Sequence, residues 1–164
     1  MALQSINPAT EESLAKYQLL EPGQAGALLQ EAYDTAARWR ATTYPERSTL
    51  LRRAGEVLRA NAGRYAGLIT AEMGKPIVEA EAEIEKCAGN CDYFAEHAAQ
   101  FLADEPIASP ARESYVAFEP LGVVLAIMPW NFPFWQVFRF AAPALMAGNT
   151  ALLKHASNVT GCAL

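Results

Sequence analysis

The sequence predicts an α/β protein in which a group of N-terminal helices precedes one βαβ unit of a parallel sheet. Two observations support this fold class. Apolar residues recur at helical spacing from about residue 28 to residue 102. Two short apolar runs then follow at 123–128 and 150–153, with a helical segment between them. A strand, a helix and a second strand in this order favour a parallel pair joined by a right-handed crossover.

The composition is that of a folded domain. The 164 residues are 52% hydrophobic and 19% charged, with a formal net charge of -5 and scattered basic residues. A nucleic-acid site needs clustered Lys and Arg, so no nucleic-acid partner is expected. The longest apolar run, 121–130, is too short to cross a bilayer, and residues 1–10 lack a secretory signal. Together with an odd number of cysteines, this favours a soluble, cytoplasmic protein without a membrane partner.

The N-terminal third predicts a hairpin or an extended arm, followed by two helices. Asn7-Pro8-Ala9-Thr10 is a turn signal between two short stretches that contain apolar residues. The first helix has apolar residues at helical spacing: Leu28, Leu29, Ala32, Ala36 and Trp39. The second helix opens near Pro45 and is expected to bury Leu50, Leu51, Ala54, Val57 and Leu58.

Two further helices complete the helical region. The third runs from about Gly63 and stops at Gly74, with Pro76 beyond it as a stop signal. The fourth spans 77–102 and has an apolar stripe: Ile77, Ala80, Ile84, Cys87, Cys91, Phe94, Ala98 and Phe101. An acidic run lies on the same helix: Glu79, Glu81, Glu83 and Glu85. We interpret this run as a solvated helix face closed by Lys86 rather than as an acidic binding site.

The segment after Pro106 predicts strands. Residues 113–118 have strand propensity and end at Pro120-Leu121-Gly122, and 123–128 reads as a strand buried on both faces. Residues 134–147 predict a helix that is disturbed by Pro143 and closed by Gly148-Asn149. Residues 150–153 form a second buried strand, and another helix begins before residue 164.

A stiff turn follows the first buried strand, where parallel sheets bind their ligands. It reads Pro129-Trp130-Asn131-Phe132-Pro133, and its two prolines restrict the backbone. An asparagine amide held in such a turn could stabilise a developing oxyanion. Asn131 could equally cap the helix that follows, and the pattern alone leaves both interpretations open.

Several motifs resemble the aldehyde dehydrogenase superfamily. They lie in order along nearly the whole chain: 7–10, Glu72-Met73-Gly74-Lys75-Pro76, 119–123, 129–133 and Gly148-Asn149-Thr150-Ala151-Leu152-Leu153-Lys154. The resemblance implies N-terminal helices plus the first βαβ unit of an incomplete Rossmann-like sheet. Residues 1–104 and 123–164 would then be part of the cofactor-binding domain, 105–122 would begin the oligomerisation flap, and the catalytic domain would be absent.

The same resemblance implies roles for the turn and for the end of the second strand. Asn131 would stabilise the oxyanion, and Ile127, Met128, Pro129 and Trp130 would line the cofactor. Lys154 would contact the adenosine ribose. Ser157 stands where NAD-preferring members have a glutamate, with His155 and Ala156 between. A neutral hydroxyl beside a lysine accommodates a 2′-phosphate, so the implied cofactor is NADP or NAD.

Arg139 suggests the aldehyde. It lies in an otherwise apolar helical segment, on the same face as Gln136. One interpretation is a structural ion pair at a domain contact, because an unpaired buried charge is costly. The other follows from the resemblance, which is strongest to bacterial succinate-semialdehyde dehydrogenases: such enzymes can carry an arginine at this offset that binds the distal carboxylate of the substrate.

The nucleophilic cysteine and general-base glutamate of the family belong to motifs that this chain does not contain. Cys87 and Cys91 read as buried packing and Cys162 as part of a helix, and no metal site is expected. Two hypotheses follow. The sequence is part of an aldehyde-oxidising homodimer or homotetramer, itself inactive as a fragment, or it is a degenerate chain with only a partial nucleotide-binding or interaction role.

Overall fold

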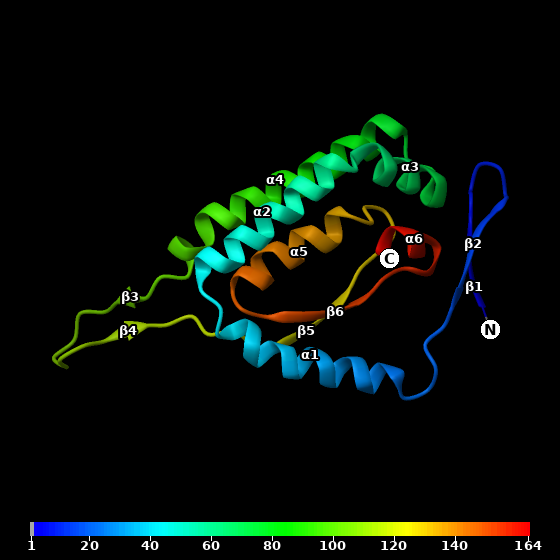
Figure 1. Ribbon diagram of the computed structural model, residues 1–164. Coiled ribbons are helices and arrows are strands. Elements are labelled where there is room, and N and C mark those ends of the chain that lie inside the picture. Colours follow the sequence, from blue (N-terminus) through cyan, green and yellow to red (C-terminus); the bar gives the residue numbers. More distant parts are fainter. Residues whose placement is uncertain (1) are drawn as a thin grey trace.

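The computed structural model describes residues 2–164 and contains helices stacked against a small parallel sheet (Figure 1). The helices before the sheet are α1 (Gln24–Arg40), α2 (Tyr44–Ala60), α3 (Ala62–Met73) and α4 (Ile77–Phe101). The sheet pairs β5 (Val123–Ile127) with β6 (Thr150–Lys154), and α5 (Trp135–Met146) connects them. A short 3-10 helix, η1 (Ser157–Val159), and α6 (Thr160–Ala163) follow β6.

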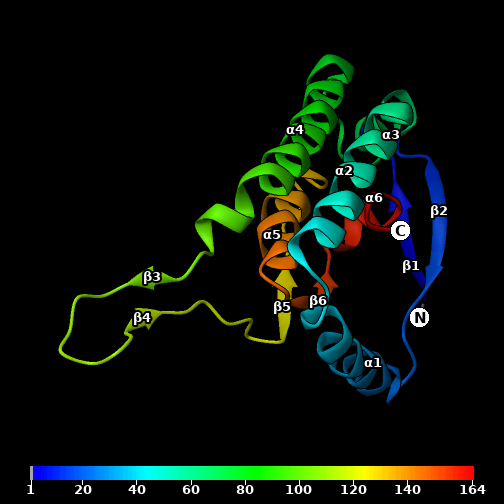
Figure 2. The same ribbon diagram turned by 60° about the vertical axis from the view of Figure 1, so that its left-hand side comes forward.

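These elements form layers. Helices α2 and α4 lie side by side on the outside, and α5 packs between them and the sheet (Figures 1 and 2). Helix α1 covers the opposite face of the sheet, mainly over β6. The predicted fold class and the parallel βαβ unit are therefore confirmed. Within residues 2–164, no helix is both long enough and apolar enough to span a membrane.

The N-terminal segment forms the hairpin that the turn signal indicates. Strand β1 (Ala2–Ile6) pairs antiparallel with β2 (Ser13–Gln18). The Asn7 side-chain oxygen accepts hydrogen bonds from the amides of Ala9 and Thr10, at 2.9 and 3.3 Å. An asparagine that bonds the backbone two residues on is a common way to begin a tight turn.

The helix ends agree closely with the sequence signals. Helix α2 starts with Pro45 in its first turn and a capping box in which Thr43 and Glu46 bond each other's backbone amides. Helix α3 ends at Gly74, whose φ of 75° lies in the left-handed region that a glycine adopts without strain.

The predicted burial of α2 is partly wrong. Leu51 and Leu58 are buried, whereas Leu50 is 56% exposed and Val57 is 41% exposed. The side of α2 that faces α4 is the side of Gly55, where an added Cβ would lie 3.2 Å from the Ala88 carbonyl oxygen. Because neighbouring helix positions are rotated by about 100°, Leu50 and Val57 point away from this close contact.

Strand β5 is also less buried than its apolar run predicts. Leu125 is 63% exposed and Ile127 is 68% exposed, and Leu153 of β6 is 38% exposed. Alternation places Val123, Leu125 and Ile127 on one face. Helix α1 covers this face only near Val123, so burial on both faces is wrong for the described residues.

Residues 105–116 form a thin arm that projects from the body (Figures 1 and 2). It consists of β3 (Glu105–Pro106) and β4 (Tyr115–Val116), which pair antiparallel. The strand predicted over 113–118 is thus reduced to two residues. Both Tyr115 and Val116 are exposed, because the strands of the projecting arm pack mainly against each other.

Arg47 joins three helices through a buried guanidinium. It donates to the carbonyls of Trp39, Arg40 and Thr42 at the end of α1, at 3.2, 2.9 and 2.8 Å. It also donates to the Met146 carbonyl at the end of α5, at 2.9 Å. Gly148 is required beside it, because its φ is 88° and an added Cβ would lie 3.1 Å from the guanidinium.

We expect Arg47→Leu to destabilise the protein strongly. It leaves the buried or part-buried carbonyls of Arg40, Thr42 and Met146 without this donor, and since each orphaned group costs about 1–3 kcal/mol, the loss should be at least about 3 kcal/mol. Urea unfolding followed by circular dichroism measures it. The control is Arg53→Leu, whose side chain is 75% exposed and pairs only with Glu56; it should change stability by less than about 1 kcal/mol. Similar losses for both variants would contradict the role of Arg47.

Candidate active site

The carboxyl ends of the two parallel strands bring the candidate cofactor residues together. Ile127 pairs with Lys154 in the strand register, and the Met128 amide donates to the Lys154 carbonyl at 3.0 Å. The turn 129–133 therefore begins beside the segment 154–157. This is the end of a parallel sheet at which ligands bind.

The turn is held from behind by a buried carboxylate on α4. The Oε1 atom of Glu83 accepts hydrogen bonds from the amides of Phe134 and Trp135, both at 2.9 Å. Its Oε2 atom forms an ion pair with Lys75, which is also buried. The Lys75 ammonium lies 3.6 Å from the centre of the Phe132 ring, a cation–π contact.

The interpretation of the acidic run as a solvated face is thus wrong for Glu83 and confirmed for its neighbours. Glu83 is 3% exposed, whereas Glu79, Glu81 and Glu85 are exposed. Glu83 lies three residues after Ala80 and four before Cys87, which places it inside the apolar stripe. This spacing indicates that Glu83 is buried.

Asn131 is exposed at the tip of this turn, and its side chain makes no hydrogen bond within residues 2–164. Helix α5 begins at Trp135, and its first amides are taken by Glu83. The start of the helix is therefore capped by Glu83 and not by Asn131. The asparagine amide remains available to a ligand at the strand end.

The segment after β6 is polar and accessible. Lys154 and Ser157 are exposed, and the Lys154 ammonium donates to the His155 carbonyl at 2.9 Å. The His155 Nε2 atom lies 3.1 Å from the Thr160 hydroxyl. Burial, and next the positive charge of Lys154, lower the pKa of His155. The ring is therefore neutral at pH 7, and the cation that this segment presents is Lys154.

A second buried carboxylate holds the elements behind that segment. Glu72, which is 2% exposed, accepts from the amides of Gly161 and Cys162 at the start of α6, each at 2.8 Å. It also accepts from the Ser5 hydroxyl at 2.7 Å, which ties the N-terminal hairpin to the same place. Glu72 was noted in the sequence only as part of a motif, although it lies three residues after the buried Ile69.

Arg139 lies on α5, eight residues beyond Asn131, and is exposed. No carboxylate lies within ion-pair distance of it in residues 2–164. Within the described residues, Arg139 therefore forms no ion pair, and an ion pair at a domain contact stays a prediction. Gln136, on the same face, is half-buried.

The three cysteines are poor nucleophiles in this environment. Cys87 and Cys91 are fully buried, as their place in the apolar stripe predicts, and Cys162 is half-buried. Burial raises the pKa of all three thiols, that of Cys91 to about 11. They are protonated at neutral pH, and the thiolate is the reactive form. In residues 2–164, no three His, Cys, Asp or Glu side chains form a group able to hold a metal ion.

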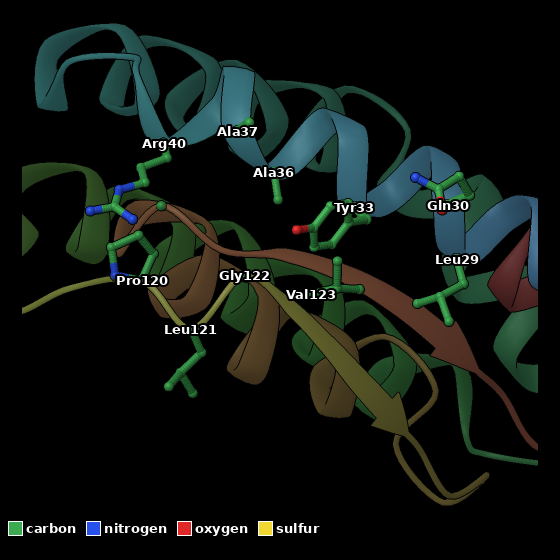
Figure 3. A pocket seen from close by; sticks show the side chains of 11 residues that line it. Leu29, Gln30, Tyr33, Ala36, Ala37, Arg40, Pro120, Leu121, Gly122 and Val123 are labelled. Atoms are coloured by element: carbon green, nitrogen blue, oxygen red, sulfur yellow. The ribbon is translucent and has the colours of Figure 1, made fainter.

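A hollow of about 680 Å³ lies at the opposite end of β5 (Figure 3). It opens between α1 and the start of the strand, where Leu29, Tyr33 and Val123 point toward one another. This is the amino end of the parallel strands, away from Asn131 and Lys154. Because ligands of parallel sheets bind at the carboxyl ends of the strands, this hollow is not the candidate active site.

Sequence comparison defines the class of protein. Residues 1–164 match the aldehyde dehydrogenase family, and the chain belongs to this family. More particularly, it is 49% identical over its whole length to a probable succinate-semialdehyde dehydrogenase [NADP(+)] of Synechocystis sp., of which it covers 36%. It is 45% identical over 167 residues to succinate-semialdehyde dehydrogenase [NADP(+)] 1 of Mycobacterium tuberculosis, again covering 36%.

A solved structure gives the same result for the fold. The succinic semialdehyde dehydrogenase from Streptococcus pyogenes, in complex with NADP+, superposes with a TM-score of 0.94 at 34% identity. The superposition covers 99% of this chain and 36% of that one. The predicted family and the incomplete α/β fold are confirmed, and the chain spans about 36% of the length of the relatives that it matches.

Proposed function

We propose that this chain is the N-terminal part of an NADP-dependent succinate-semialdehyde dehydrogenase. The observation that carries the proposal is the position of the turn 129–133, which carries the exposed Asn131, directly after the carboxyl end of β5, where Ile127 pairs with Lys154 and the exposed Ser157 follows β6. The similarity to succinate-semialdehyde dehydrogenases over the whole chain supports the aldehyde and the cofactor.

In the proposed reaction a cysteine thiolate from outside this segment attacks the aldehyde carbon, and the carbonyl electron pair moves to oxygen. Asn131 donates a hydrogen bond to that oxyanion. NADP+, when bound between the turn 129–133 and the segment 154–157, would supply the acceptor for the hydride that leaves the tetrahedral carbon. Hydrolysis of the resulting thioester releases the carboxylate and regenerates the thiol. The buried, protonated thiols of Cys87, Cys91 and Cys162 are unsuited to the nucleophilic role.

The residues present fit NADP+. The segment Ile127-Met128-Pro129-Trp130 would lie against its nicotinamide side, and the segment Lys154-His155-Ala156-Ser157 would hold the adenosine ribose. A 2′-phosphate is dianionic, and the exposed Lys154 ammonium and Ser157 hydroxyl offer a positive charge and a neutral donor. No carboxylate occupies this segment to repel the phosphate.

The arm and the domain boundaries form part of the same proposal. Residues 1–104 and 123–164 belong to the cofactor-binding domain, and 105–122 begins an oligomerisation flap of a homodimer or homotetramer. The arm of β3 and β4 supports this, because it projects from the body with exposed Tyr115 and Val116. A catalytic domain outside this segment supplies the nucleophile, so the 164 residues alone should not oxidise an aldehyde.

The oxyanion role predicts a loss of turnover on substitution of Asn131. In the full-length enzyme, Asn131→Ala should lower kcat by about 10²–10³, with little change in KM, because the donor acts on charge that develops in the transition state. NADPH formation at 340 nm measures it. The control is Asn131→Asp, which keeps the size of the side chain but cannot donate, and should be at least as impaired. An active Asn131→Asp enzyme would rule out the donor role.

The cofactor assignment predicts a switch at Ser157. Ser157→Glu places a carboxylate where the 2′-phosphate binds, so the ratio of kcat/KM for NADP+ over NAD+ should fall by about tenfold or more. Ser157→Ala removes only the hydroxyl and should change that ratio much less. Steady-state kinetics with both cofactors measure it. A wild-type enzyme inert with NADP+, or an equal loss with both cofactors, would refute the assignment.

The substrate assignment predicts a selective effect at Arg139. Arg139→Ala should raise the KM for succinate semialdehyde by about tenfold or more, because charge-assisted pairing with the distal carboxylate is lost. The KM for an uncharged aliphatic aldehyde should change little. Arg139→Lys keeps the charge and should recover part of the loss. If both aldehydes are affected equally, Arg139 does not bind the carboxylate.

A further inference from the structure

Lys75 and Glu83 form a buried ion pair that the proposed reaction does not use directly. Their residues are 6% and 3% exposed, and both lie behind the turn rather than at its tip. A buried pair of charges carries a desolvation penalty and adds little stability compared with apolar packing. The contacts of the Lys75–Glu83 pair indicate its role.

The polar contacts of the pair lead to the end of the turn and to the start of α5. The two amides that bond Glu83 belong to Phe134 and Trp135, and the Lys75 ammonium lies over the ring of Phe132. The residues that contact the ion pair, Phe132, Phe134 and Trp135, begin immediately after Asn131. The two prolines restrict single dihedral angles, whereas the ion pair ties the turn to α4 and to the short segment between α3 and α4.

Both oxygens of the carboxylate are needed. Oε1 accepts two backbone amides, and Oε2 accepts from Lys75. A glutamine at this position has one acceptor oxygen, and its NH₂ group would face either the amides or the ammonium, which are donors themselves. Glu83→Gln therefore loses either the bonds to the two amides or the bond to Lys75, while leaving the size of the side chain almost unchanged.

We propose that Glu83 and Lys75 are positioning residues for aldehyde oxidation, which hold residues 132–135 so that the Asn131 amide stays aimed at the developing oxyanion. This inference rests on the proposed role of Asn131. A displacement of a reacting group by about 1 Å can cost about 10² in rate. Weakening the contacts of Glu83 and Lys75 with residues 132–135 should thus lower turnover without removing any group that touches the substrate.

Glu72 provides a matched control. It is also a buried glutamate that accepts two backbone amides, but these belong to Gly161 and Cys162, and its third donor is Ser5. It makes no contact with the turn. Glu72→Gln should lower the melting temperature as much as Glu83→Gln does. Because Glu72 contacts the segment after β6 and not the turn, any effect of Glu72→Gln on turnover should be independent of Asn131 and equal in the wild-type and Asn131→Ala backgrounds.

The decisive experiment is a double-mutant cycle in the full-length enzyme. Glu83→Gln alone should lower the single-turnover rate of NADPH formation by about 10–100-fold. In the Asn131→Ala background the same change should cost less than about threefold, because the group that Glu83 positions is already gone. Phe132→Leu, which removes the ring beneath Lys75, should show the same non-additivity and serves if Glu83→Gln does not fold.

The possible results separate the two proposals. If Asn131→Ala retains nearly full turnover, the proposed oxyanion role fails and the inference with it. If Asn131→Ala loses about 10² or more while Glu83→Gln is harmless, or costs the same factor in both backgrounds, Asn131 keeps its role and the positioning inference is overturned. If the effect of Glu72→Gln on turnover also disappears in the Asn131→Ala background, the coupling is not specific to Glu83 and the inference is likewise overturned.

Discussion

The contact between Glu83 and the first amides of α5 is the constraint on which the site depends. The start of a helix leaves amide groups without partners, and its positive end favours a carboxylate. Here that carboxylate comes from α4, more than fifty residues earlier in the chain. Because Glu83 takes the capping role, Asn131 need not point back at the helix. One interaction thus joins α4 to α5, closes the helix end and leaves the tip of the turn to a ligand.

The α3–α4 corner is the frame for both halves of the proposed cofactor site. Glu72 at the end of α3 holds the start of α6 behind Ser157, and Lys75 and Glu83 hold the turn after β5. Between them, Gly74 turns the chain with a positive φ. The contacts of the motif 72–76 explain its residues. Two charged side chains, one on either side of a glycine with positive φ, contact the segments that follow β5 and β6.

The sequence predicted what local chemistry determines. Helix ends follow from Pro45 and Gly74, the hairpin follows from the turn at Asn7, and the parallel unit follows from two apolar runs around a helix. It failed where burial depends on distant partners. A glutamate among other glutamates looks solvated until the backbone amides that it serves are known, as with Glu83. An apolar strand looks buried until the covering helix is placed, as with Leu125. Within the site, Asn131 and Lys154 were identified from motifs, whereas the side chains that orient their loops were not.

Arg47 bears on the order in which this chain can fold. Three of its carbonyl partners lie within eight residues, so the α1–α2 corner can form early from local contacts. Its fourth partner, Met146, is 99 residues away. Long-range contacts of this kind form slowly, because the loop must close before they contribute. During synthesis on the ribosome, the donor of Arg47 that bonds Met146 therefore remains in contact with water until α5 has been synthesised. Docking of α5 then completes the contact between the α1–α2 corner and the sheet.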